Sequence, residues 1–226
     1  MPIVRLPREI AFPDPRLADD EVVAVGGDLN PRRVLAAYSV GIFPWPHEGM
    51  PLLWFSPDPR FVLPLEELQV ARSLRQVIRK RKFELRLDSD FAGVMAGCAG
   101  VKRKRQKGTW ITPEMRSAYL ALNRAGAALS VETWQAGQLV GGLYGVAIGR
   151  VFFGESMFAR SRDASKVALA RLVDECLRRD VRLIDCQMQT AHLFSLGARA
   201  IPRREFLRHV TAWADPALRL WQGGDR

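Results

Sequence analysis

Two carboxylates stand inside segments that otherwise look like apolar strands, and they are the first candidates for chemistry. Glu155 interrupts FFGESMF, residues 152–158, and Asp185 interrupts LIDCQ, residues 183–187. A buried carboxylate is costly unless it finds a partner, and such a cost often marks a functional site. Two interpretations stay open. Either the acids form an anionic patch for a cationic substrate, or an Arg or Lys holds each of them for structural reasons.

Two tryptophans lie in settings that suit nucleotide binding. Trp110 follows the basic run KRKRQK, residues 102–107, within three residues, and cations beside an aromatic ring can bind unpaired bases. Trp45 stands between two prolines in GIFPWP, residues 41–46, where it either packs as an apolar plug or is held rigidly for stacking. Charge runs are usually solvated. Here we expect phosphate contacts from Lys102, Arg103, Lys104 and Arg105.

Several familiar signatures are missing, which narrows the enzyme class. The sequence has neither a P-loop nor a G-x-G-x-x-G motif. GESMF, residues 154–158, lacks the second glycine of a nucleophile elbow, which disfavours a serine hydrolase. The turn ARSRDASK, residues 159–166, contains no glycine and so disfavours coenzyme A. Three scattered cysteines and three histidines without ligand spacing predict reduced thiols and no metal site.

The most informative bulk property is charge. The 226-residue chain carries a formal net charge of +10, which suits a polyanionic partner without separating tRNA from DNA, anionic lipid or an acidic protein. The hydrophobic fraction of 48% is that of a folded domain. No apolar run has the length of a membrane span or of a signal peptide, so we expect a cytoplasmic protein.

The elements that must position these residues fall into two regions. The first sixty residues hold most of the fourteen prolines and one clear helix. Asn30 is a suitable N-cap for that helix, Pro31 suits its first turn, and Gly41 closes it. We predict a small N-terminal domain over residues 1–61 and a larger domain over residues 62–226.

The larger region has a mixed α/β (α+β) pattern. Its last five elements before residue 188 are predicted as strand, strand, strand, helix and strand, which is the order of the acetyltransferase-like (GNAT) core. Many acyl donors suit that fold, so the order alone names no substrate. Periodicity predicts helices over 66–80, 90–99, 113–124 and 164–178, the last capped by Asp163, and strands over 83–87, 129–134, 138–149, 150–158 and 181–187.

Whole motifs say more than composition does. The chain resembles the leucyl/phenylalanyl-tRNA–protein transferases along nearly its whole length. The matching stretches are GGDLNP (26–31), GIFPWP (41–46), LWFSPDPR (53–60), GTWITPEM (108–115), VGGLYG (140–145), FFGESMF (152–158), DASKVAL (163–169), LIDCQ (183–187), SLGA (195–198) and IPR (201–203). Each stretch alone is weak, but ten in order with matching spacing are specific.

This resemblance implies a fold, an activity and a set of site residues. The fold is a small N-terminal domain joined to a GNAT-like C-terminal domain. The activity is transfer of Leu, Phe or, less well, Met from tRNA to a protein that begins with Arg or Lys, which marks that protein for degradation. Trp45 and Trp110 match the tryptophans that hold the terminal adenosine of the tRNA, and Asp185 and Gln187 match the catalytic pair. The amino-acid side-chain pocket corresponds to Phe152, Glu155, Met157, Leu169, Leu172 and Ile184, with the family pattern varying at Leu172.

The implied chemistry needs no cofactor, because an aminoacyl ester is already activated. We hypothesise that Gln187 contacts the attacking amine and is oriented by Asp185. The proton then goes to Asp185 or to the ribose hydroxyl of the tRNA. The partners would be aminoacyl-tRNA and a protein with N-terminal Arg or Lys, and nothing demands more than a monomer. The alternatives are an acetyl-CoA-dependent N-acetyltransferase of the same fold and a non-catalytic RNA-binding protein.

Overall fold

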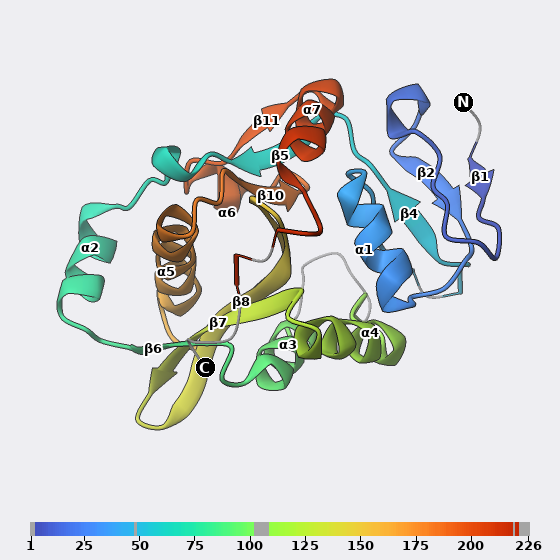
Figure 1. Ribbon diagram of the computed structural model, residues 1–226. Coiled ribbons are helices and arrows are strands. Elements are labelled where there is room, and N and C mark those ends of the chain that lie inside the picture. Colours follow the sequence, from blue (N-terminus) through green and yellow to red (C-terminus); the bar gives the residue numbers. More distant parts are fainter. Residues whose placement is uncertain (1–2, 48, 102–108, 219, 222–226) are drawn as a thin grey trace.

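The chain folds around two β-sheets of different size, shown in Figure 1. The computed structural model describes residues 3–47, 49–101, 109–218 and 220–221. The run at 102–107, with the four predicted phosphate contacts, lies outside these residues. The smaller sheet has the order β1-β2-β4-β3, with bounds β1 Val4–Arg5, β2 Val22–Val25, β4 Leu53–Phe55 and β3 Phe43–Pro44.

Helix α1, Pro31–Ser39, is the predicted helix of the N-terminal region. The Asn30 side chain accepts a hydrogen bond from the N–H of Arg32, and Pro31 occupies the first turn, where its missing N–H costs nothing. Gly41 follows the helix with a φ of 77°, a conformation that favours glycine. The helix packs against α4 and β8 as well as β3, so its inner face reaches the larger sheet.

The larger sheet has seven strands in the order β11-β5-β10-β9-β8-β7-β6. Three antiparallel strands are followed by α5 and then by β10, which pairs parallel to β9. The predicted order of strand, strand, strand, helix and strand is therefore confirmed, and so is the mixed α/β class. The bounds are β5 Arg60–Leu63, β6 Glu84–Leu87, β7 Ala128–Gln135, β8 Gln138–Ile148, β9 Val151–Ala159, β10 Leu183–Gln187 and β11 Arg199–Ile201.

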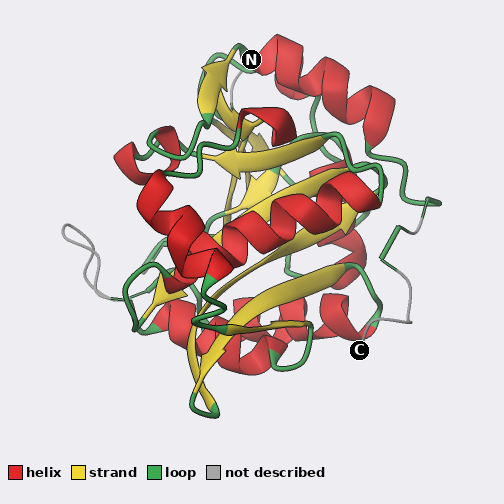
Figure 2. Cartoon of the chain, turned by 90° about the vertical axis from the view of Figure 1, so that its left-hand side faces the viewer, coloured by secondary structure: helices red, strands yellow, loops and turns green. Residues whose placement is uncertain are grey.

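Helices cover both faces of the larger sheet, and the sheet separates two hydrophobic clusters. Figure 2 looks onto the face that carries α5, Ala164–Arg178. Neighbouring residues on β9 serve the two cores, because Phe152 packs into the cluster beneath α5 and Phe153 into the cluster shared with α1. The remaining helices are α2 Arg72–Arg79, α3 Phe91–Ala99, α4 Pro113–Arg124, α6 Ala191–Phe194 and α7 Arg203–Trp213.

Two local predictions were wrong. The helix expected from residue 66 begins only at Arg72, after a short 3-10 turn at Leu65–Glu67. The N–H of Gln69 donates instead to the carbonyl of Leu196, which holds the intervening chain extended. Asp163 precedes α5 as expected, but its φ of 69° leaves its side chain without a capping hydrogen bond.

Two irregularities in strand pairing create the space that a site needs. β9 and β10 pair from Leu183 with Val151 to Asp185 with Phe153, and they separate beyond that point. The pairing of β8 with β9 shifts as well, so that Glu155 is an extra residue between the partners of Tyr144 and Gly145. Such a β-bulge re-aims the side chains that follow it.

The change from the smaller to the larger sheet falls between Phe55, the end of β4, and Arg60, the start of β5. The division into domains at residues 61 and 62 stays a prediction. Within the part of the chain that the structure describes, no helix is long and apolar enough to cross a membrane.

Candidate active site

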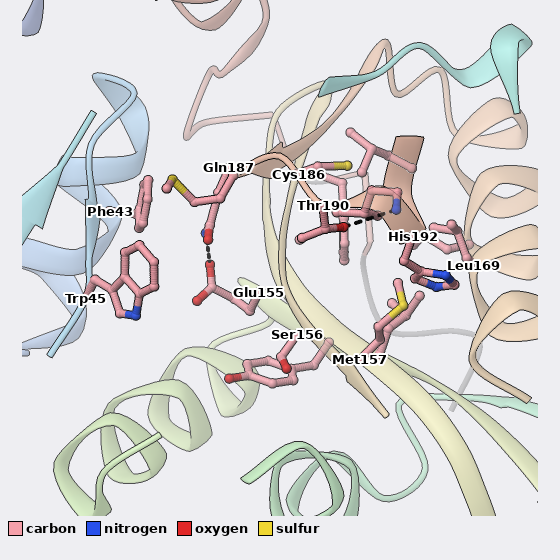
Figure 3. Close-up of a pocket in the computed structure, with 18 of the residues that line it drawn as sticks. Phe43, Trp45, Glu155, Ser156, Met157, Leu169, Cys186, Gln187, Thr190 and His192 are labelled. Carbon is pink, nitrogen blue, oxygen red and sulfur yellow. Dashed lines mark hydrogen bonds between the residues drawn. The ribbon is translucent and has the colours of Figure 1, made fainter. Parts of the chain in front are cut away.

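A cavity of about 430 Å³ opens where β9 and β10 separate (Figure 3). Residues from both sheets and from α5 and α6 line it, so segments far apart in the sequence meet here. Its volume is in the range of small-molecule sites. The predicted residues that line it are Trp45, Trp110, Phe152, Glu155, Met157, Leu169, Leu172, Ile184 and Gln187.

One end of the cavity is apolar. Phe152 and Ile184 are buried on the paired parts of β9 and β10, and Leu169 and Leu172 lie one turn apart on α5. Met157 reaches this end because of the bulge. Residues five apart would point to opposite faces of a regular strand, yet Phe152 and Met157 pack against the same cluster. This end suits an aliphatic or aromatic side chain.

The other end is aromatic and polar. Figure 3 shows Glu155 and Gln187 facing each other on the side of Phe43 and Trp45, away from Met157 and Leu169. The Trp45 ring packs against Phe43 and Phe55, with ring centroids 6.4 and 5.3 Å apart. Trp110 lines the same cavity and is 9% exposed. The two predicted tryptophans therefore reach one cavity from different parts of the chain.

Glu155 is held by two phenols and an amide rather than by an Arg or Lys. Its Oε1 accepts hydrogen bonds from Tyr38 Oη at 2.5 Å and Gln187 Nε2 at 2.6 Å, and its Oε2 accepts one from Tyr119 Oη at 3.0 Å. Burial raises the pKa of Glu155 to about 7 against the lowering effect of these three hydrogen bonds, and the charge of Asp185 raises it further. Glu155 can therefore change charge near neutral pH.

Asp185 fits the structural interpretation of a buried acid, because an arginine pairs with it. Its Oδ1 and Oδ2 accept from Arg60 Nε at 2.8 Å and Nη2 at 2.6 Å, and both side chains are fully buried. The Arg60 guanidinium also lies 4.7 Å from the ring centre of Phe43 and 4.4 Å from that of Phe206. The Asp185 carboxylate lies behind the cavity wall, and Gln187 alone of the predicted catalytic pair faces the cavity.

Asp185 nevertheless acts on Gln187, through the backbone. The N–H of Gln187 donates to Asp185 Oδ1 at 2.8 Å. Gln187 has a φ of 59°, and Met188 N–H donates to the Cys186 carbonyl at 2.7 Å across it. A tight turn with positive φ is strained for a residue other than glycine and persists only where its surroundings enforce it. The Asp185 carboxylate is one such restraint, and the turn aims the Gln187 amide at Glu155.

Sequence reasoning missed several residues that build the site. The sequence patterns single out none of Tyr38, Tyr119 and Arg60 as a site residue. A helical pattern cannot separate a tyrosine that fills the core from one that binds a carboxylate. His192 on α6 also lines the cavity, and burial, with a smaller effect of Lys166, lowers its pKa. Across the described residues no group of three or more His, Cys, Asp or Glu could hold a metal ion.

Comparison with known proteins gives matches over both regions. The family model described as leucyl/phenylalanyl-tRNA protein transferase matches residues 62–211, and the model of that transferase's N-terminal domain matches residues 27–58. A leucyl/phenylalanyl-tRNA–protein transferase of Anaeromyxobacter sp. is 54% identical over 100% of this chain and 98% of its own length. One of Syntrophobacter fumaroxidans is 57% identical over 92% of this chain and 89% of its own.

Together with the fold and the site, these matches define an enzyme of the aminoacyltransferase class. More closely, the chain belongs to the leucyl/phenylalanyl-tRNA–protein transferase family. Among solved structures, a GCN5-related N-acetyltransferase-like protein from Streptococcus suis overlaps 73% of this chain and 61% of its own, with a TM-score of 0.38 and 15% identity. The fold class rests on this chain's own sheet order instead.

The buried pair predicts an asymmetric response to mutation. Asp185→Ala leaves Arg60 buried without its carboxylate, so we expect a loss of about 3–5 kcal/mol in the free energy of unfolding. The double variant Arg60→Met with Asp185→Leu removes both charges and should recover most of that loss. Urea unfolding of the three proteins measures it. Equal stability of Asp185→Ala and the unmutated protein would contradict the structural role of the pair.

Proposed function

We propose that this chain transfers leucine or phenylalanine, and methionine less well, from aminoacyl-tRNA to proteins that begin with Arg or Lys. The modified protein would carry a bulky apolar N-terminal residue and enter N-end rule degradation. One observation carries the proposal: in a member of this transferase family, an apolar recess and a titratable carboxylate share one cavity lined by two tryptophans. We further infer that the protein acts as a monomer in the cytoplasm.

The donor would occupy the apolar end and the tryptophan side of the cavity. The leucine or phenylalanine side chain would lie among Phe152, Leu169 and Ile184, and the terminal adenosine would contact Trp45 and Trp110. A missing methylene in an apolar pocket costs about 1–3 kcal/mol, so alanine should be excluded easily and methionine only modestly. The varied position Leu172 lines this end, which makes it a candidate for setting the preference between leucine and phenylalanine.

The acceptor would enter beside Glu155. Of the two candidate acids, Asp185 already pairs with Arg60. Among the described residues, the groups that donate hydrogen bonds to Glu155 are two phenols and an amide, all of them neutral. A guanidinium or ammonium group at Glu155 would gain a charged partner in a partly buried place. This favours Glu155 as the contact for the N-terminal Arg or Lys.

The reaction exchanges one acyl bond for another. The neutral α-amine attacks the ester carbonyl, a C–N bond forms, and the C–O bond to the tRNA ribose breaks as the ribose oxygen takes up a proton. The amine titrates near pH 8, so a fraction of it is nucleophilic at neutral pH. Gln187 would orient the amine, since an amide is a poor base, and Asp185 would position Gln187. The neighbouring ribose hydroxyl is then the better candidate for carrying the proton.

The tRNA body would lie against basic surface. The run from Lys102 to Arg105 stays a proposed phosphate contact. The described residues offer a second basic strip along and after α2, where no acid occurs between residues 68 and 83. Its exposed cations are Arg72, Arg75, Arg79, Lys80, Arg81 and Lys82. Phosphate contacts of this kind do not read bases, which suits an enzyme that accepts several tRNAs.

The test of the function is transfer itself. Radiolabelled leucine on tRNA should pass to peptides beginning with Arg or Lys and should not pass to a matched peptide beginning with Asp. Acetyl-CoA offered with the same peptides should give no product. Binding of tRNA without any transfer would instead favour a non-catalytic RNA-binding protein.

Trp45→Ala should lower kcat/KM for the donor roughly 5- to 150-fold, because stacking on a base contributes about 1–3 kcal/mol. Trp45→Phe should keep most of the activity, since a phenyl ring still offers a stacking face. Steady-state kinetics with leucyl-tRNA varied at saturating peptide measure both. An unchanged donor kcat/KM in Trp45→Ala would remove Trp45 from the adenosine site.

The combined change Arg75→Glu and Arg79→Glu should weaken tRNA binding and flatten its dependence on salt. Each lost phosphate contact reduces the slope of log K against log salt by about 0.7–0.9. Arg204→Glu with Arg208→Glu makes the same charge change on exposed residues of α7 and serves as the matched control. Filter binding at salt concentrations from roughly 50 to 200 mM measures the two slopes. Equal slopes for the two double variants would exclude α2 from the tRNA surface.

A further inference from the structure

Three oxygen-bearing groups from three separate elements meet at the polar end of the cavity. Tyr38 comes from α1, Tyr119 from α4 and Glu155 from the bulge in β9. The two phenol oxygens lie 2.6 Å apart, and each also contacts the carboxylate, Tyr38 at 2.5 Å and Tyr119 at 3.0 Å. The three groups therefore form a closed ring of contacts. The transfer mechanism above makes no use of the phenols.

Counting protons shows what this ring does. Three contacts each need one hydrogen, but two phenols supply only two. With a charged Glu155, one contact is left without a hydrogen, and two oxygens face each other there. A neutral Glu155 supplies the third, so that each of the three groups donates once and accepts once around the ring. Gln187 Nε2 donates to Oε1 in either state.

The surroundings of the ring decide how firmly that proton is held. The charge of Asp185 on β10 favours the neutral form of Glu155. Arg60 on β5 pairs with Asp185, and Tyr144 on β8 packs edge-on against the Tyr119 ring. His192 lines the cavity from α6, and burial lowers its pKa, which favours the neutral imidazole.

We propose that burial keeps one proton on Glu155 in the empty enzyme, that Tyr38 and Tyr119 are positioning residues whose hydrogen bonds make this proton exchangeable, and that the cationic side chain of the acceptor expels it on binding. The proposal rests on the proposed function. In this step the O–H bond of Glu155 breaks and the proton passes to buffer. The guanidinium or ammonium group then takes the proton's place as a partner of the carboxylate.

This arrangement would help select the acceptor. In an empty cavity, or in one that holds an uncharged N-terminal residue, Glu155 stays neutral and the ring with Tyr38 and Tyr119 stays fully hydrogen-bonded. A bound cation pairs with ionised Glu155. Ionisation costs little free energy near neutral pH, because burial raises the pKa of Glu155 only to about 7. The phenol hydrogen bonds lower that pKa, so removing either phenol raises it further.

The main test measures protons released on binding. A pentapeptide beginning with Arg is titrated into the enzyme at about pH 6.5 in buffers of different ionisation enthalpy. Glu155→Gln is the matched variant, because its amide copies the donor and acceptor pattern of the neutral acid and has no proton to release. The unmutated enzyme should release about three quarters of a proton more than the variant, as a group with a pKa of about 7 would. No difference between the two proteins would overturn the proposal.

The role of the phenols is tested by the pH dependence of peptide binding. For the unmutated enzyme the apparent Kd should rise about tenfold from pH 8 to pH 6, as the fraction with charged Glu155 falls. Tyr38→Phe and Tyr119→Phe should move the midpoint to higher pH. Ser39→Ala deletes a hydroxyl on the same helix that donates to the Leu35 carbonyl, and should leave the midpoint in place. A uniform weakening at every pH, with unmoved midpoints, would make the phenols structural only.

Leucine transfer to the same peptide, run in parallel at pH 8, separates this inference from the function on which it rests. Transfer by the unmutated enzyme without excess proton release would overturn the proton ring and leave the function intact. An Arg peptide that neither binds nor accepts leucine would overturn both.

Discussion

The site depends on one buried ion pair. Arg60 and Asp185 are fully buried, joined by two hydrogen bonds and separated by 125 positions in the sequence. A buried pair offsets its desolvation only with good geometry and further hydrogen bonds. Here the Arg60 guanidinium also donates to the Gly41 carbonyl, and Asp185 accepts from the Gln187 backbone. The pair therefore joins the segment that carries Trp45 to the turn that carries Gln187.

The second constraint is the separation of two parallel strands. β9 and β10 stay paired up to Asp185, which brings Glu155 and Gln187 close enough for a side-chain hydrogen bond just past the last pair. Because of the bulge, the residues of β9 that follow Gly154 face two different environments, one polar and one apolar. Glu155 points to the tyrosines and Met157 to the leucines of α5, so one short strand supplies both a polar and an apolar contact. A site that must bring an apolar acyl group next to a cationic acceptor needs this division.

Much of the scaffold could be predicted because its signals are local. α1, α4 and α5 begin and end as expected, and for α1 and α4 the reason is visible in the Asn30 and Thr112 side chains, which accept backbone hydrogen bonds at their first turns. α2 was misjudged because its start depends on Gln69 meeting a loop far along the chain. Local patterns are weakest where tertiary contacts decide.

The matched sequence motifs contain most of the residues that line the cavity. The motifs alone could not predict the electrostatics of the site. In the sequence, Glu155 and Asp185 look alike, because each is an acid in an apolar strand. In the structure, they differ in their hydrogen-bond and ionic partners. Asp185 meets Arg60 and stays paired, whereas Glu155 meets Tyr38 and Tyr119 and can lose or gain a proton. These partners are distant in sequence, and no spacing rule connects them. Under the proposed function, this difference would give Asp185 a positioning role and Glu155 the contact with the acceptor.

The most direct test of this account is the single-turnover rate of leucine transfer in Arg60→Met, Asp185→Asn and the double variant, each verified as folded. If the pair acts as one unit that positions Gln187, the two single variants should lose similar factors in rate, and the double variant should lose little more than either. A large loss in Asp185→Asn beside a nearly unchanged Arg60→Met would contradict the account, because it would make Asp185 a base in its own right.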